Sequence, residues 1–384
     1  MLTTGIYIYE NTSIEHCFRN SYQRHYKRKV FLMDHHLIYY RNLTTINPND
    51  IYFTDMGKGK VSKISGHVLA PYLDTLVQSE DPSLPQPHKS PYETTSLEFL
   101  NLFKNIKTQG YNPKYPVQVA IDPLGRAIVC DGIHRTLVCR KLGITSMPCL
   151  ILYRSIEWWL FRSALYNQHS NTTKLYQKVN HFDFNLWTSW RVDCDIRAEL
   201  IYNDVIKFHA EPKSLVGAEI ACNTGTISCA LARKGVTMRG FDTDPKCINS
   251  ASRLAQMDAI GARFESNEGT SILASFELCG QVIDPNKLPD CDFIICLSLL
   301  NHFQIDERRT EAGLNIFRNL AMKTNRIYLD CPVDRDAVGG GTEFTQPQKV
   351  FEWCASAGIG GHGRIVAEIE SNKPLMRPLL VWEF

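Results

Sequence analysis

Two short segments of this sequence combine residue types that can bind an anion or the hydroxyl groups of a ligand. The first is CDGIHRTLVCRKLG, from Cys130 to Gly143, where an acid, a glycine, a histidine and an arginine precede an apolar, basic stretch. Gly132 permits close approach of a ligand, and His134 and Arg135 supply hydrogen-bond donors where a helix is expected to begin. Because a helix N-terminus attracts negative charge, this turn favours a phosphate.

The second segment is GAEIACNTGTISCALARKG, whose pattern predicts a strand, a turn of small residues and a helix. The turn runs from Glu219 to Gly225, and its backbone N–H groups can approach a ligand closely. The following strand, VTMRGFDTD, ends at Asp242, 17 positions after Gly225. An acid at that place can accept hydrogen bonds from ribose hydroxyls, so the two features together indicate a cofactor site.

Alternating strands and helices are expected to position both segments. Around the first, the pattern predicts a helix over 95–109, strands VQVAI and AIVC, a helix over 135–142 and a strand PCLILY. From residue 214 onward it predicts GAEIA, a helix over 227–234, VTMRGFD, a helix over 246–257, DFIICLSLL, a helix after Glu307, RIYLD, RIVAEIE and PLLVWEF. Such alternation is typical of a doubly wound, parallel α/β sheet.

The C-terminal part, about Ser214 to Phe384, resembles class I S-adenosylmethionine-dependent methyltransferases. The resemblance implies a Rossmann-like fold in which Ala221 and Asn223 stand where the family's turn more often has glycine. Alanine still permits close approach, and asparagine tolerates the left-handed backbone. The cofactor-binding residues implied are listed here: Glu219, Ala221, Asn223, Gly225, Asp242 for the ribose, Asn267 after the third strand for the adenine, and Leu297.

The resemblance makes DFIICLSLLNHF the fourth strand and its following loop, and Leu297 to His302 are expected to face the transferred methyl group. His302 is the candidate for proton transfer, although methyl transfer to an oxygen that is already ionised needs little beyond in-line positioning. A packing or capping role for this histidine is the alternative. A dehydrogenase shares the strand, turn and acid, but the fourth strand and the antiparallel-looking final pair favour the methyltransferase.

The segment from about Ser90 to Arg154 resembles the ParB/sulfiredoxin-like domain, in which a Gly-x-(His or Arg)-Arg turn binds nucleotide phosphates. The resemblance implies phosphate or nucleotide binding by Gly132, His134 and Arg135. Ile133 replaces the reactive cysteine of sulfiredoxins and the glutamate of ParB proteins. Because some ParB-like domains are small-molecule kinases, Asp131 is a second candidate catalytic residue, with ATP or CTP and Mg²⁺ as ligands. The alternative is that Asp131 and Arg135 simply pair with each other.

These patterns divide the chain into four parts: a β-rich arm (1–65), a ParB-like α/β domain (66–154), an aromatic, mostly helical bridge (155–212) and a methyltransferase domain (213–384). The segment Glu80–Pro91 has four prolines in 12 positions and is expected to be an extended loop. The bridge contains WWLF and NHFDFNLWTSW, which are too apolar to stay solvated. We therefore expect it to cover the methyltransferase pocket.

The composition excludes several classes. With 384 residues and a net charge of +2, the chain is long enough for two domains and has no general attraction for nucleic acid. Its 13 cysteines lack CxxC pairs and zinc spacing, which indicates neither disulfides nor a metal. No segment reads as a signal peptide or a membrane span, so a cytoplasmic protein is expected.

The function expected from the sequence is that of an O-methyltransferase with a small-molecule or glycan acceptor, joined to a domain that binds nucleotide or phosphate. Enzymes of surface-polysaccharide synthesis that phosphorylate a glycan end and then methylate the phosphate offer an analogy. The first alternative is a nucleic-acid methyltransferase, docked through the ParB-like domain and the basic stretch Arg19–Lys29. The second is a non-catalytic N-terminal scaffold. The oligomeric state is left open.

Overall fold

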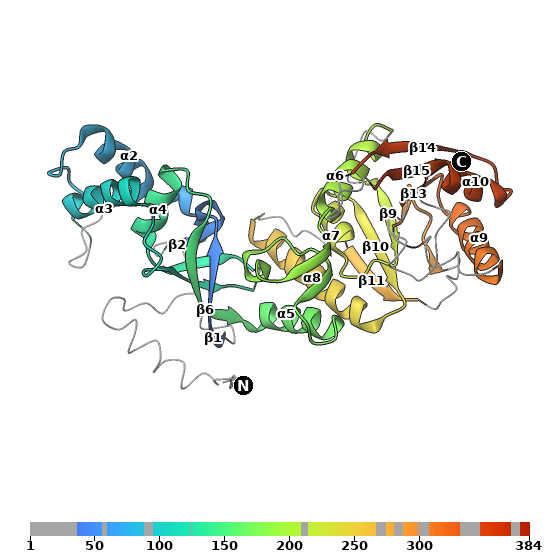
Figure 1. Ribbon diagram of the computed structural model, residues 1–384, viewed down its shortest axis with the longest axis horizontal. Helices are drawn as coiled ribbons and strands as arrows, with labels where there is room; N and C mark the ends of the chain where they lie inside the picture. Colours follow the sequence, from blue (N-terminus) through green and yellow to red (C-terminus); the bar gives the residue numbers. More distant parts are fainter. Residues whose placement is uncertain are drawn as a thin grey trace. The chain divides into compact units, whose positions relative to one another are not determined.

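The computed structural model describes residues 37–55, 60–87, 95–123, 125–208, 214–265, 274–279, 287–297, 299, 307–330, 346–369 and 377–384. The chain forms two compact units, coloured along the sequence in Figure 1. The first comprises Met1–Leu160 and Asn180–Leu186, and the second comprises Phe161–Val179 and Trp187–Phe384. In the described ranges, no helix has both the length and the apolar character that crossing a membrane requires.

The first unit is built on a mixed six-stranded sheet with the order β1-β6-β4-β5-β2-β3. The strands are β1 (Leu37–Ile46), β2 (Ile51–Asp55), β3 (Lys60–Lys63), β4 (Val117–Ile121), β5 (Ala127–Asp131) and β6 (Met147–Ser155). Strand β6 runs parallel to β4 and antiparallel to β1, and β2 runs parallel to β5. Residues of the expected arm therefore form three strands of the same sheet as VQVAI, AIVC and PCLILY, and not a separate part.

Three helices that pack against one another lie beside this sheet: α2 (Leu69–Ser79), α3 (Ser96–Gln109) and α4 (Ile133–Lys141). Helix α3 begins with a capping box, in which Thr95 accepts from the Glu98 N–H and Glu98 accepts from the Thr95 N–H. This pairing satisfies two N–H groups that the first turn would otherwise leave unpaired. Leu100, Phe103 and Ile106 are buried, as their helical spacing predicts, whereas Leu97 of the same predicted set is 51% exposed and Phe99 is buried in its place.

The second unit contains a seven-stranded sheet with the order β11-β10-β9-β12-β13-β15-β14. The strands are β9 (Val216–Ile220), β10 (Thr237–Asp242), β11 (Ala274–Leu278), β12 (Phe293–Cys296), β13 (Arg326–Asp330), β14 (His362–Ala367) and β15 (Leu379–Glu383). Strands β11, β10, β9, β12 and β13 are parallel, while β15 runs antiparallel to both β13 and β14. This is the doubly wound arrangement expected from the alternation, closed by one reversed strand between β13 and β14.

Helices cover both faces of this sheet. They are α7 (Thr226–Ala232), α8 (Pro245–Glu265), α9 (Glu307–Ala321) and α10 (Pro347–Ser356). Ala218 and Ile220 pack in the core formed with α9 and α10, whereas Glu219, between them in β9, bonds to Ser228 of α7. Because successive side chains of a strand point to opposite faces, α7 lies on one face and α9 and α10 on the other.

The expected helix over 246–257 is longer than its pattern suggested, and this moves the third strand. Helix α8 continues to Glu265, and the strand next to β10 begins only at Ala274. Asn267 was expected to follow that strand. It lies outside the described residues, but its number places it before β11. The residue that follows the strand is Cys279, whose N–H donates to the Asp242 carbonyl at 2.9 Å.

The expected bridge is not mostly helical and is divided between the two units. Its elements are helix α5 (Ile156–Gln168), strand β7 (Lys174–Gln177), the 3-10 helix η3 (Phe182–Phe184), strand β8 (Thr188–Arg191) and helix α6 (Cys194–Val205). The short stretch Asn180–Leu186 belongs to the first unit. It is fixed there by the buried pair Arg154–Asp183, and Trp158 Nε1 donates to the same carboxylate at 2.8 Å.

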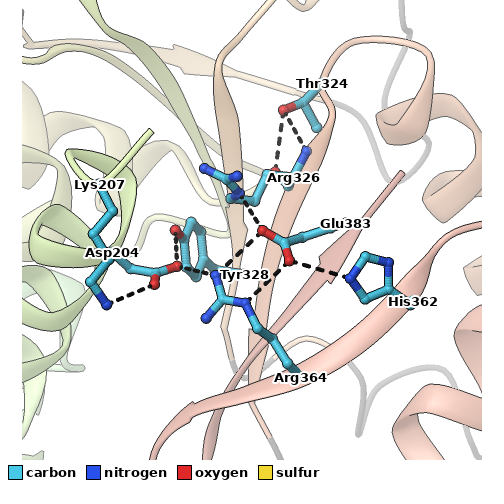
Figure 2. Close-up of polar contacts among 8 residues, drawn as sticks. All are labelled: Asp204, Lys207, Thr324, Arg326, Tyr328, His362, Arg364 and Glu383. Carbon is cyan, nitrogen blue, oxygen red and sulfur yellow. Dashed lines mark hydrogen bonds and ion pairs between the residues drawn. The ribbon is translucent and has the colours of Figure 1, made fainter. Parts of the chain in front are cut away.

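A polar network joins the last strands of the second unit to α6, as Figure 2 shows. Arg364 of β14 lies between the carboxylates of Asp204 and Glu383, at 2.7 Å and 3.1 Å. Tyr328 donates to Asp204 at 2.8 Å, and Arg326 pairs with Glu383 at 2.9 Å. Arg326 begins β13, so this network marks the edge of the sheet where the parallel strands start. It therefore stabilises the reversed strand at the edge opposite the turns that follow the strands.

Candidate cofactor site

The turn after β9 has left-handed backbone at every second residue. The φ angles are +58° at Ala221, +53° at Asn223 and +72° at Gly225. Alanine and asparagine thus adopt at the first two positions the conformation that glycine adopts most easily. Most N–H groups of the turn donate within the protein: that of Cys222 to the Phe241 carbonyl, that of Gly225 to the Cys222 carbonyl and that of Asn223 to Asp242.

Only glycine fits at the third of these positions. A Cβ atom on Gly225 would lie 2.6 Å from a Phe276 ring carbon and 2.9 Å from Ala251 Cβ. Gly240 in β10 meets the same ring, because a Cβ there would lie 2.4 Å from it. Phe276 therefore packs directly on the backbone of the turn and of the neighbouring strand, which holds helix α7 close to the sheet.

Asp242 ends β10 beside this turn and is bonded to it. Its Oδ2 accepts from the Asn223 N–H at 2.8 Å, and its Oδ1 accepts from the Asp244 N–H at 2.9 Å. The side chain is buried, at 8% exposure. Each carboxylate oxygen can still accept a second hydrogen bond. The structure thus brings together the left-handed turn and the acid that the sequence predicts as a ribose acceptor.

Glu219 is buried, and its carboxyl group bonds to the first turn of α7. Its Oε2 accepts from the Ser228 N–H at 3.0 Å and from the Ser228 hydroxyl at 2.5 Å. Gly225, the N-cap of α7, has no side chain, so the Glu219 carboxyl group satisfies an N–H of the first turn instead. Burial raises the pKa of Glu219 to about 7, and its bonds to Ser228 oppose that shift.

The expected bridge contributes two amide side chains to the same place. Gln168, the last residue of α5, donates from Nε2 to Asn223 Oδ1 and to Cys247 Sγ, both at 3.2 Å. Gln177 of β7 accepts from the Thr226 N–H at 3.4 Å, at the start of α7. The expected bridge therefore reaches the cofactor turn through these two amide side chains.

A buried cluster of charges lies at the end of β13. Asp330 pairs with Arg377 at 2.9 Å, with Arg191 at 3.5 Å and with Arg197 at 3.6 Å. Asp193 accepts from both Arg191 and Arg197. Asp242 and Asp330 are each the last residue of a parallel strand, so both carboxylates lie at the edge where open α/β sheets bind ligands.

Of the three remaining predicted residues, Leu297, Asn267 and His302, the structure describes only Leu297. Leu297 follows β12 directly and is buried, at 7% exposure. Asn267 and His302 lie outside the described residues. The catalytic role of His302 therefore stays a prediction. In the described part of the chain, no group of three His, Cys, Asp or Glu side chains is arranged to hold a metal.

The other predicted site, the turn before α4, is formed but its arginine is engaged. Gly132 is the N-cap of α4 with φ +96°. Arg135 donates to the carbonyls of Tyr115 and Pro116, and its Nη2 lies 2.7 Å from Asp131 Oδ2. His134 packs edge-on against Phe99, with ring centroids 4.8 Å apart. This is the pairing of Asp131 with Arg135 that the sequence left open as an alternative.

Sequence patterns missed the two glutamines and the buried charge cluster for one reason. Gln168 and Asn223 are 55 residues apart, and Arg197 meets the Arg377 carbonyl across 180 residues. No periodicity reports contacts of that range. One signal was available for the cluster, because the strand RIYLD ends in an acid as GFD does.

Comparisons with known proteins give matches among solved structures. No family model matches the chain, and no curated protein matches it. WbdD, described as a bifunctional kinase-methyltransferase, matches at 21% identity over 57% of this chain and 46% of that one, with a TM-score of 0.43. The chain therefore spans about half the length of WbdD.

Magnesium protoporphyrin IX methyltransferase (ChlM) from Synechocystis PCC 6803, with bound SAM, matches at 17% identity over 54% of this chain and 85% of that one. Its TM-score is 0.36. The proposals below rest on the residues of this chain.

Proposed function

We propose that the second unit binds S-adenosylmethionine and transfers its methyl group to an oxygen acceptor. The observation that carries the proposal is the left-handed turn Ala221–Gly225 with Asp242 bonded to its Asn223 N–H. The small residues of the turn let a ligand approach its backbone closely, and the carboxylate offers acceptors to the ribose. The bound cofactor supplies an activated methyl group, so the chain has to bind it and bring the acceptor into line with it.

The sheet order favours this reading over a dehydrogenase. A dinucleotide-binding sheet has six parallel strands in the order 3-2-1-4-5-6. Here the position after β13 is filled by β15, which is antiparallel and lies between β13 and β14. That reversed strand and β14 form the antiparallel final pair that the sequence associated with the methyltransferase resemblance.

Calorimetric titration with S-adenosylmethionine and S-adenosylhomocysteine tests the cofactor. Wild-type protein is expected to bind both, and NAD⁺ much more weakly. Asp242→Ala should weaken binding by about 1 to 3 kcal/mol, because it leaves ribose hydroxyls unpaired. Asp290→Ala is the matched control, since that carboxylate is 90% exposed and distant in sequence from the turn. No binding by the wild type, or equal binding by a folded Asp242→Ala variant, overturns the proposal.

For the first unit we propose phosphate binding at the turn before α4, by exchange of partners at Arg135. Support comes from the positive φ of Gly132, which permits close approach, and from the start of α4 at that point. Because Asp131 already occupies Arg135 Nη2, a phosphate has to displace that carboxylate. A kinase role for Asp131 would begin from the same exchange. The acceptor would then be a phosphorylated small molecule or glycan, methylated by the second unit.

The proposed exchange of partners at Arg135 predicts the direction in which two substitutions change the affinity for nucleotides. Asp131→Asn should increase the affinity of the full chain for ATP or CTP, because it removes the competing charge, and should abolish any phosphate transfer. Arg135→Lys should weaken nucleotide binding although the charge is kept, because lysine lacks the fixed fork. Duplex DNA binding that falls steeply with salt, without nucleotide binding, would favour the nucleic-acid alternative instead.

A further inference from the structure

Helix α5 and strand β7 precede the predicted methyltransferase domain by some 40 residues, yet they touch its cofactor turn. Gln168 reaches Asn223, in the turn after β9, and also Cys247, near the start of α8 after β10. It therefore bridges the two loops that Asp242 also joins through the Asn223 N–H. Gln168 thus bonds to the side chain of Asn223, and Asp242 bonds to the backbone N–H of the same residue.

The orientation of the Gln168 amide is fixed by its partners. Asn223 Oδ1 accepts from the Thr224 hydroxyl at 2.9 Å and from Gln168 Nε2, while Asn223 Nδ2 donates to Cys247 Sγ at 3.6 Å. Gln168 must present its NH₂ group there, at 3.2 Å. The carbonyl oxygen, Oε1, consequently points away from Asn223.

That Oε1 atom is buried and, within the described part of the chain, has no hydrogen-bond partner. A buried amide oxygen without a donor costs free energy, and native structures rarely leave one so. Gln168 can therefore accept one further hydrogen bond beside the turn. A ligand group that carries a donor and reaches the space near Asn223 would pair with it.

A ribose meets this requirement. It has two adjacent hydroxyl donors, and Asp242, bonded to the same Asn223, is the acceptor proposed for one of them. Because Gln168 and Asp242 both bond to Asn223, we expect the second hydroxyl of a ribose held by Asp242 to lie near Gln168. The two side chains then share the diol, one as a carboxylate and one as a neutral carbonyl.

We propose that Gln168 is a cofactor-binding residue that accepts a hydrogen bond from a ribose hydroxyl of S-adenosylmethionine, beside Asp242. The inference rests on the proposed function and extends the cofactor site to α5. It makes the segment Phe161–Val179 a part of the binding site and not a connection between two domains.

The test compares ligands as well as variants of the full chain. S-adenosylhomocysteine, its 2′-deoxy and 3′-deoxy analogues and its analogue without the amino group are titrated into wild type, Gln168→Leu and Gln168→Glu. Gln168→Leu should bind S-adenosylhomocysteine about tenfold more weakly than wild type does. With one of the two deoxy analogues, this difference should disappear, because the hydrogen bond is absent from both complexes. Gln168→Glu keeps an acceptor oxygen and should keep the sensitivity to that hydroxyl.

Controls separate this inference from the proposed function. Asn167→Leu changes an exposed amide one residue earlier in α5 and should leave every affinity unchanged. If wild type binds no S-adenosyl ligand, the proposed function fails. If wild type binds but Gln168→Leu loses the same factor with all four ligands, the residue acts only on the turn and the inference is overturned. The inference is also overturned if the difference between wild type and Gln168→Leu disappears with the analogue without the amino group but persists with both deoxy analogues.

Discussion

Ala221 has a φ of +58°, which costs an L-residue about 1 kcal/mol that glycine does not incur. We expect Ala221→Gly to stabilise the second unit by up to about 1 kcal/mol, after allowance for the greater freedom of glycine in the unfolded chain. Urea unfolding followed by circular dichroism measures the change. Ala218→Gly, in the extended strand β9, is the control and should destabilise the protein. An Ala221→Gly variant that unfolds at lower urea than wild type would contradict the backbone argument.

Glu219 gives the second unit a dependence on pH. Its folded pKa of about 7 lies above the ordinary value of 4.5, so the folded state retains a proton that the unfolded chain releases. Its contribution to stability is full below about pH 4.5 and falls as the pH rises to about 7. Glu219→Gln keeps an acceptor for Ser228 and removes the proton. We expect the unfolding free energy of wild type to fall relative to this variant across that window, and parallel curves would refute the assignment.

At the level of single residues, the sequence predicts those whose role is local. Left-handed backbone at Asn223 follows from residue type within a strand-turn-helix pattern, and its φ angle of +53° confirms it. The close approach of a ligand at Ala221 stays a prediction. The placement of Asp242 beside the turn follows from the adjacency of consecutive parallel strands. Gln168 could not be found in this way, because its place depends on how a distant helix ends.

The network of Figure 2 allows two bonds to one carboxylate to be compared. Asp204 is 2% exposed and pairs with Arg364 at 2.7 Å, and with the exposed Lys207 at 3.5 Å. Arg364→Ala should destabilise the second unit by about 3 kcal/mol, since it leaves Asp204 buried and also removes a partner of Glu383. Lys207→Ala should cost less than about 1 kcal/mol, because a solvated ion pair contributes little. Thermal unfolding measures both, and equal losses would contradict this account.

Helices and strands are predicted well where their ends carry recognisable capping or turn residues. Helix α3 begins one residue after the expected Thr95 because Thr95 caps it, and VQVAI is the strand as expected. The third strand of the second sheet was not found, because ASFEL lacks a long apolar run and α8 continues past Met257. Residues 1–65 were expected to be a separate arm because the partners of β1 and β2 follow much later in the chain: Leu37 pairs with Ser155, and Ile51 pairs with Ala127.

Across the whole molecule, the two units should respond to acid in opposite directions. In the first unit, burial lowers the pKa of His181 to about 4, and its neutral ring accepts from the Asp183 N–H while Nε2 lies 2.5 Å from the Gly125 carbonyl oxygen. Its contribution to stability is therefore full above pH 6.5 and falls as the pH drops towards 4. The contribution of Glu219 changes the other way.

Calorimetry between pH 6.5 and 4.5 should show the difference. The transition of the first unit should move to lower temperature relative to that of the second as the solution is acidified. His181→Gln, which cannot take up the proton, should reduce that relative movement. Glu219→Gln should reduce it as well, from the other side. Transitions whose separation does not depend on pH in wild type would show that these two groups do not control it.

The chain passes between its units three times, after Leu160, Val179 and Leu186. No single cut can therefore separate the protein into two complete halves. A truncated protein that starts at residue 213, the domain boundary predicted from the sequence, retains the cofactor turn. It loses Gln168, Gln177 and two of the three arginines that pair with Asp330, namely Arg191 and Arg197. A useful split has to keep Phe161–Val179 with the C-terminal fragment. The N-terminal fragment would then need Asn180–Leu186 supplied as a separate peptide.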